Sequence, residues 1–295
     1  MRVVAIGEIL WDVFPDGEHL GGAPFNFSAH AARLGHEVLF LSAVGDDVRG
    51  HAALQTARGL GLRMEFLRLA PGAPTGSVSV SLDSEGRPSF TIHRPAAYDY
   101  LRLSPEDLNS LAQFEPQLVY FGTLHQTTPE VKALTSLVIE ACPQARRFYD
   151  VNLRRDSYNL ILLEELLMLA DVVKLNEDEV VELSRLFGLP YASLRRFCEY
   201  WSGRCGWETV VVTLGEKGCA AFGDGEWVEA PGYPVQVSDT VGSGDAFAAA
   251  FVHGLSMGWP LAQAADLANR VGALVASRPG AVPPWTIEEC QALIR

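Results

Sequence analysis

The sequence lacks a long apolar run, a cluster of basic residues and a paired cysteine motif. A membrane helix needs roughly 18 or more consecutive apolar residues. The apolar stretch at 2–7 is short and is followed by Glu8, so we expect a strand there rather than a signal peptide. Nucleic-acid surfaces need clustered Lys and Arg, whereas the formal net charge here is −13. These absences predict a protein with no nucleic-acid and no membrane partner.

Cysteine pairs and the common nucleotide motifs are also missing. Five cysteines occur without a C-x-x-C spacing, which argues against a disulfide framework or a zinc site. Unpaired thiols are typical of the reducing cytoplasm, where we expect the protein to reside. There is neither a G-x-x-x-x-G-K-[S/T] loop nor a G-x-G-x-x-G turn after a strand. Any nucleotide must therefore be held by other means.

What the 295 residues do contain is a regular alternation of apolar strand patterns and helical patterns. Such alternation predicts an α/β fold with a doubly wound, mostly parallel central sheet and helices on both faces. The expected strands are 2–7, 37–45, 118–122, 146–152, 171–176 and 208–215, and the first expected helices are 23–35 and 46–61.

Two segments, 11–22 and 75–94, interrupt this alternation. The second alternates small apolar and polar residues around the turn SEGRP, which predicts an antiparallel hairpin with one exposed face. We expect a small antiparallel sheet that acts as a lid and excludes water; the alternative is a surface hairpin without a role. The predicted parts are a core domain of 1–10, 23–73 and 101–295, and a β-sheet lid of 11–22 and 74–100.

The stretch VSDTVGSGDAFAAAFVHGL, residues 238–256, places a glycine turn at the start of a predicted buried helix. Backbone N–H groups at a helix N-terminus are free to bind an anion, and glycine lets a ligand approach them closely. Asp245 then lies beside that anion. A carboxylate there is a poor binding group but a suitable general base, as phosphoryl transfer requires. The alternative is an ordinary acidic residue in the first turn of a helix.

The segment DTVGSGDAF resembles the D-T-x-G-A-G-D-x-F signature of the ribokinase, or PfkB-type, family of carbohydrate kinases, with Ser243 in place of Ala. Further similar segments follow in the family's order along nearly the whole chain. They are GGAPFNFSAHAARLG (21–35), AVGDD from residue 43, DVNLR (150–154), NEDE (176–179), TLGEKG (213–218) and NRVGALVASRPGA (269–281). The resemblance implies a ribokinase-like fold that uses ATP and Mg²⁺.

The resemblance also implies roles for individual residues. Asp245 would be the catalytic base, and the main-chain N–H groups of Gly242, Ser243 and Gly244 would form the anion hole. Asn176 and Glu179 would hold Mg²⁺ through water, although the same spacing is that of a helix capping box. The residues implied at the nucleotide are Thr213, Gly215 and Gly218 near phosphate and ribose, and Asn269 near adenine; the alternatives are a plain strand exit and a polar spot on a helix.

Many members of this family also bind a monovalent cation through carbonyl groups. Pro284 stands where that site often has Ser, and the alternative is a chain without functional K⁺. The groups that match the K⁺ site are those of Asp239, Val241, Val275, Arg278 and Gly280.

The sugar acceptor side is implied by residues near the first strand, the lid and the DVNLR segment. A carboxylate, amide and guanidinium groups together suit a polyol, which needs both donors and acceptors. The implied substrate-binding residues are Asp12, Gly22, Asn26, Arg94 and Arg154. The alternatives are a turn acid for Asp12 and a surface cation for Arg94.

The sequence from Gly7 to Asp47 resembles that of bacterial fructokinases, and Leu20 occupies the position where ribokinases have Lys. The resemblance thus implies that ATP phosphorylates the 6-hydroxyl of D-fructose. The alternatives are a 2-keto-3-deoxygluconate kinase, a nucleoside kinase and a non-catalytic sugar sensor on the same fold. An exposed lid edge also predicts a homodimer formed through the lid.

Overall fold

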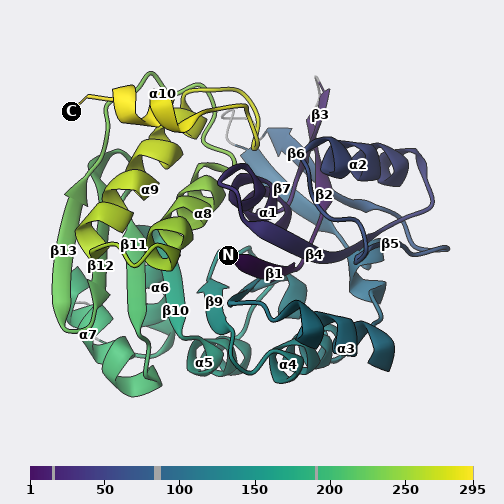
Figure 1. The fold of residues 1–295 in the computed structure, drawn as a ribbon, viewed down its shortest axis with the longest axis horizontal. Coiled ribbons are helices and arrows are strands. Elements are labelled where there is room, and N and C mark those ends of the chain that lie inside the picture. Colours follow the sequence, from purple (N-terminus) through teal and green to yellow (C-terminus); the bar gives the residue numbers. More distant parts are fainter. Residues whose placement is uncertain (15–16, 83–87, 190–191, 295) are drawn as a thin grey trace.

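The computed structural model describes residues 1–14, 17–82, 88–189 and 192–294, and within them the strands form two sheets (Figure 1). The larger sheet has the order β13-β12-β11-β10-β9-β8-β1-β4-β5. Its pairs are parallel except those that β12 makes with β11 and β13. The strands are β1 (Arg2–Ile6), β4 (Glu37–Val44), β5 (Leu67–Leu69), β8 (Leu118–Gly122), β9 (Arg146–Asp150), β10 (Val172–Asn176), β11 (Thr209–Thr213), β12 (Gly218–Gly223) and β13 (Glu226–Pro231).

Helices cover both faces of this sheet (Figure 1). One face carries α1 (Ala23–Arg33), α2 (Val48–Gly59), α8 (Ser243–Ser256), α9 (Leu261–Ala276) and α10 (Ile287–Ala292). The other carries α3 (Pro105–Phe114), α4 (Pro129–Ala141), α5 (Leu160–Leu169), α6 (Glu177–Leu186) and α7 (Leu194–Cys205). Short 3₁₀ turns are η1 (Ala97–Tyr100), η2 (Leu124–Gln126) and η3 (Gly215–Lys217). The predicted doubly wound fold is confirmed.

Strand β1 shows why its sequence is apolar throughout. Val3 and Ala5 belong to the hydrophobic cluster under one layer of helices, and Val4 and Ile6 belong to the cluster under the other. Successive side chains of a strand point to opposite faces, so a strand covered on both faces needs apolar residues at every position.

The second sheet has the order β3-β2-β6-β7, with β2 (Leu10–Phe14), β3 (Gly17–Gly21), β6 (Gly76–Leu82) and β7 (Pro88–His93); we call it the lid sheet. The pairs β2–β3 and β6–β7 are antiparallel, as predicted, whereas β2 and β6 pair in parallel. Two separate hairpins therefore join side by side, because both of their first strands leave the core in the same direction. Most of the predicted turn SEGRP lies outside the described residues.

Within the described ranges, no helix is both long and apolar enough to cross a membrane.

Candidate active site

The predicted site residues gather mainly where strands of the large sheet end. Glu8 follows β1, Asp150 ends β9 and Asn176 ends β10. Ligands of open α/β sheets bind at this carboxyl edge. The N-termini of α1 and α8 lie at the same edge, since Asn26 of α1 contacts Asp245 of α8.

Helix α8 starts as the sequence predicts, with the glycine turn at its N-terminus. Gly242 is the N-cap, with φ of 76°, and a Cβ there would clash with the backbone of Ala281. The N–H of Ser243 donates to the Thr240 carbonyl at 3.2 Å. The N–H groups of Gly242 and Gly244 have no acceptor among the described residues, so these two donors are available to an anion.

Asp245 is a buried carboxylate in the first turn of α8, with an exposed fraction of 9%. Asn26 donates from Nδ2 to its Oδ2 at 2.8 Å. Burial raises the pKa of Asp245 to about 6, and the negative charge of Asp150 adds to this rise. Lys174, Asn26 and Arg154 oppose it by stabilising the ionised form. The result is a base that is ionised at neutral pH and can still accept a proton.

The start of α1 brings the predicted acceptor residues Gly22 and Asn26 next to that base. Gly22 is the N-cap of α1, and a Cβ on it would lie 2.6 Å from the Glu8 carbonyl oxygen. Its own carbonyl accepts from Asn26 N–H at 2.9 Å. The Oδ1 atom of Asn26 is buried and has no hydrogen-bond partner among the described residues, so the amide still offers an acceptor.

Asp12 and Arg154 lie within electrostatic range of each other, and Arg154 is also within range of Asp245. Asp12 is on β2 of the lid sheet; burial raises its pKa, and the positive charge of Arg154 lowers it. Arg154 is exposed, and its Nη1 donates to the Leu153 carbonyl at 3.2 Å. Its charge also acts on Glu8 and Asp245. The structure thus places this guanidinium close to three carboxyl groups.

Arg94 differs from the exposed edge cation that the hairpin pattern allows. Its guanidinium pairs with Asp99, donates to the Leu124 carbonyl at 2.7 Å and contacts Thr127. It also lies over the Tyr98 ring, 5.5 Å from the centroid. These contacts already engage each of its nitrogens, so its role in substrate binding stays a prediction.

Asn176 and Glu179 form the capping box that their spacing allows. Asn176 Oδ1 accepts from Glu179 N–H, and Glu179 Oε2 accepts from Asn176 N–H, both at 2.8 Å. Glu179 Oε1 also accepts from Leu153 N–H at 2.9 Å, which ties this carboxylate to the segment before Arg154. In the part of the chain that the structure describes, no group of three His, Cys, Asp or Glu residues could hold a metal. A role in holding Mg²⁺ stays a prediction.

The predicted nucleotide residues lie on adjoining segments, because the Gly218 N–H donates to the Gly215 carbonyl. Thr213 ends β11 and Gly215 begins η3. Gly218 packs so closely on Ala230 that a Cβ would clash with its carbonyl, and Asn269 Nδ2 donates to the same carbonyl at 2.9 Å. Asn269 therefore holds α9 against β13. A cavity of about 600 Å³ lies nearby, lined by Val235, Gln236, Val237, Ser238 and Ser277.

The residues predicted for a monovalent cation lie on two adjoining segments. Asp239 accepts from Val241 N–H at 3.0 Å and from Gly280 N–H at 3.1 Å. Val275 is buried in α9, and the Arg278 guanidinium pairs with Glu289 at 2.6 Å. The structure brings the segments together, and K⁺ binding stays a prediction.

Three charged residues of the site were missed by the assignment of roles: Glu8, Asp150 and Lys174. Glu8 is 3% exposed, and its Oε2 has no hydrogen-bond partner in the part of the chain that the structure describes. Burial raises its pKa to about 7. Lys174 Nζ lies 3.0 Å from Asp150 Oδ1, and both residues are buried. A signal was present, because a lysine inside the apolar strand VVKLN needs a buried partner.

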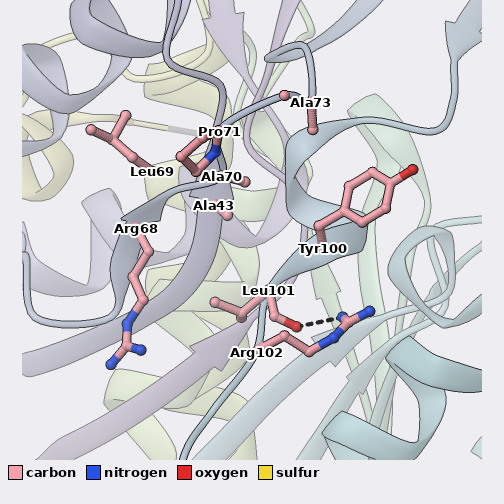
Figure 2. A pocket seen from close by; sticks show the side chains of 10 residues that line it. Ala43, Arg68, Leu69, Ala70, Pro71, Ala73, Tyr100, Leu101 and Arg102 are labelled. Atoms are coloured by element: carbon pink, nitrogen blue, oxygen red, sulfur yellow. Dashed lines mark hydrogen bonds between the residues drawn. The ribbon is translucent and has the colours of Figure 1, made fainter.

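A separate cavity of about 460 Å³ lies beside the ends of β4 and β5. Figure 2 shows Tyr100 and Arg102 on its rim, with the Arg102 guanidinium bonded to the Leu101 carbonyl at 2.8 Å. None of the predicted site residues lines this cavity, so it is not part of the candidate active site.

A buried carboxylate beside free amides at a helix start, on a doubly wound sheet with a smaller second sheet, is an arrangement that could serve phosphoryl transfer. The chain matches the pfkB family carbohydrate kinase description over residues 12–288. It therefore belongs to the pfkB family of carbohydrate kinases.

Relatives within the family differ in the acceptor that their names state. The chain is 31% identical to a fructokinase of Klebsiella pneumoniae, over 95% of each chain. It is also 31% identical to an aminoimidazole riboside kinase of Salmonella typhimurium, over 95% of this chain and 91% of that one. A fructokinase from Vibrio cholerae, solved with fructose, ADP and calcium, superimposes with a TM-score of 0.80 at 27% identity, covering 95% of this chain and 94% of that one.

Proposed function

We propose that this carbohydrate kinase transfers the γ-phosphoryl group of ATP to the 6-hydroxyl of D-fructose. The main support is the buried Asp245 carboxylate beside the amides that begin α8. Asn26 Nδ2 donates a hydrogen bond to this carboxylate at 2.8 Å. Fructokinases among the relatives, and the fructose and ADP bound to one of them, support this acceptor and this donor.

The proposed chemistry is an in-line phosphoryl transfer. The sugar oxygen attacks the γ-phosphorus while its proton passes to Asp245. The bond from that phosphorus to the bridging oxygen breaks, and ADP leaves with the electron pair. The free N–H groups of Gly242 and Gly244 would stabilise the charge that develops on the phosphoryl oxygens.

The charges at the site favour a neutral acceptor over an acid. The Arg154 guanidinium lies near Asp12 and Asp245, and it donates to a backbone carbonyl rather than to a carboxylate. The Arg94 guanidinium is already paired with Asp99. A sugar acid such as 2-keto-3-deoxygluconate would add another negative charge. A polyol instead uses Asp12 and Asn26 as acceptors and Arg154 as a donor.

A nucleoside acceptor needs an aromatic surface for its base. The ring of Tyr98, close to the lid sheet, is 0% exposed and lies under Arg94, so it cannot stack on a base. This contact removes Tyr98 as a stacking surface, and adenosine and aminoimidazole riboside in the acceptor panel test the nucleoside alternative.

We further propose that ATP binds with Mg²⁺ between the glycine turn and the ends of β10 and β11. Glu179 and Asn176 offer hard oxygen atoms at this edge, which suit Mg²⁺ through water. The metal would neutralise charge on the phosphates. The cavity lined by Val235 to Ser238 and Ser277 is our candidate for the adenine end.

The lid sheet, the K⁺ site and dimerisation are further parts of the proposal. The lid carries Asp12, so its closure would bring an acceptor group to the sugar and exclude water. Its edge strands are β3 and β7, and either edge could pair with a second copy of the chain.

The test is a panel of D-fructose, 2-keto-3-deoxygluconate, D-ribose, adenosine and aminoimidazole riboside, each assayed for ADP formation with Mg²⁺ and ATP. The proposal predicts the highest kcat/KM for fructose and a 6-phosphate product by NMR. A higher kcat/KM for any other compound overturns the acceptor. Omitting K⁺ from the assay tests the proposed cation site. Measuring the molecular mass in solution tests the proposed homodimer.

A further inference from the structure

Lys174 is a buried cation directly beneath the glycine turn of the proposed anion hole. It lies within β10, and its register partner on β9 is Asp150. Nζ lies 3.0 Å from Asp150 Oδ1 and 3.1 Å from Oδ2. Tyr120 also donates to Asp150 Oδ2 at 3.1 Å. Two strands and a tyrosine thus fix the ammonium group in one place.

The ammonium lies next to the space that a side chain at Gly244 would occupy. A Cβ added to Gly244 would lie 3.3 Å from Lys174 Nζ and 3.9 Å from Cε. A side chain at position 244 would therefore require the ammonium to shift by a few tenths of an ångström. Glycine at this position leaves the ammonium room near the backbone whose N–H group has no acceptor among the described residues.

The charge state of Lys174 suits contact with phosphate. The ammonium is paired with a buried carboxylate, since Nζ lies 3.0 Å from Asp150 Oδ1. An ammonium has three N–H donors, and Asp150 is the only acceptor that it contacts among the described residues. One donor remains for a ligand.

A purely structural role is a weak explanation of this pair. Burying two charges costs free energy that their attraction often fails to return, and well-packed apolar residues can replace such pairs without loss. The neighbours of Lys174 in β10, Val173 and Leu175, are apolar and buried, so the fold places a cation in an otherwise apolar strand.

We propose that Lys174 is a catalytic residue that contacts the transferring phosphoryl group through its third N–H, beside the amide of Gly244. The inference rests on the proposed kinase chemistry and adds a side-chain cation to the main-chain anion hole. As the bond to the bridging oxygen breaks, Lys174 stabilises the charge on the oxygens of the moving group and keeps its own proton.

The first test compares Lys174→Met with the wild type on whichever acceptor the wild type phosphorylates. We expect kcat to fall at least about 10²-fold, the loss typical of one anion-hole donor, with KM for the sugar changed little. Lys132→Met, which removes a surface ammonium paired with Glu165, should keep the wild-type kcat. An unchanged kcat in Lys174→Met overturns the proposal.

Two further comparisons separate phosphate contact from indirect roles. If Lys174 acts only by lowering the pKa of Asp245, Lys174→Met should recover its rate at high pH. If it only neutralises Asp150, Lys174→Met with Asp150→Asn should recover its rate at all pH values. Either recovery overturns the proposal, and a loss that persists in both supports it. The double variant leaves neither member of the Lys174–Asp150 pair as an unpaired charge, which limits the cost to folding.

Gly244→Ala provides a test that keeps Lys174 and every main-chain donor. The added methyl group would require the ammonium to shift by a few tenths of an ångström, so we expect a smaller loss of kcat than in Lys174→Met, and an unchanged kcat contradicts the contact. Binding of ADP with aluminium fluoride, a phosphoryl mimic, gives a readout independent of turnover. Lys174→Met should weaken it at least about 10-fold while ADP alone binds as in the wild type; equal binding of the mimic overturns the proposal. This binding experiment tests the role of Lys174 even if fructose proves not to be the acceptor.

Discussion

Replacing Asn26 by Ala should move the acid limb of the pH–rate profile to higher pH. Asn26 donates to Asp245 Oδ2 at 2.8 Å in a buried setting, and this bond stabilises the ionised carboxylate. Without this hydrogen bond, the ionised carboxylate is less stable relative to the protonated form, so the pKa of Asp245 rises. Since the base must be ionised to accept a proton, activity is lost at a higher pH than in the wild type.

The size of the shift follows from the hydrogen bond. A hydrogen bond to a charged group contributes about 1.5–3 kcal/mol, and one pKa unit corresponds to about 1.36 kcal/mol. The pKa of Asp245 is about 6 in the intact site. Loss of the bond therefore predicts an acid limb of kcat/KM about one to two units higher.

The assay is kcat/KM for the sugar between about pH 5 and 9.5, at saturating ATP and constant ionic strength. Ser28→Ala is the matched control, because Ser28 is buried on the same helix and donates instead to the Pro24 carbonyl at 2.7 Å. The control should keep the wild-type midpoint. An unshifted midpoint in Asn26→Ala would refute the assignment of the limb to Asp245.

Three other perturbations probe separate parts of the site. Arg154→Ala should raise KM for the sugar more than KM for ATP in steady-state kinetics, because its charge lies near Asp12 and Asp245; equal increases contradict that placement. Gly242→Ala should lower the free energy of unfolding in urea by more than the roughly 1–3 kcal/mol of backbone strain, because its Cβ would also clash with Ala281. Gly225→Ala, which has a similar φ and open space around it, should cost the strain alone, and equal losses would exclude the clash. Glu8→Gln should flatten the pH dependence of the free energy of unfolding. The pKa of Glu8 is raised to about 7 in the folded protein, so the folded state binds a proton that the unfolded state has lost. In the wild type, stability therefore falls as pH rises from about 4.5 to 7. A slope that survives in Glu8→Gln would place the titration elsewhere.

The local elements were predictable because their causes are local. The apolar run at 2–7 became β1 (Arg2–Ile6), and the glycine turn before Asp245 became the start of α8. In both cases the signal lies in consecutive residues, whose burial or backbone freedom decides the structure. The carboxylate of the proposed base and its neighbour Asn26 were also indicated by motif resemblance.

Contacts between distant segments were not predictable from these patterns. Lys174 and Asp150 meet because β9 and β10 are neighbours in one register, which no local pattern specifies. Arg94 was expected to bind substrate, with a surface cation as the alternative, and the fold brings the Leu124 carbonyl and Asp99 to it. The parallel pair β2–β6 likewise depends on how two hairpins leave the core.

The most direct test of the whole account is kcat of Asp245→Asn with ATP and sugar both saturating. The amide keeps the shape of the side chain but cannot accept the proton from the sugar hydroxyl. We predict a folded enzyme that still binds sugar and whose kcat is lower by at least roughly 10²-fold. A kcat near the wild-type value would show that the proton goes elsewhere and would contradict the mechanism.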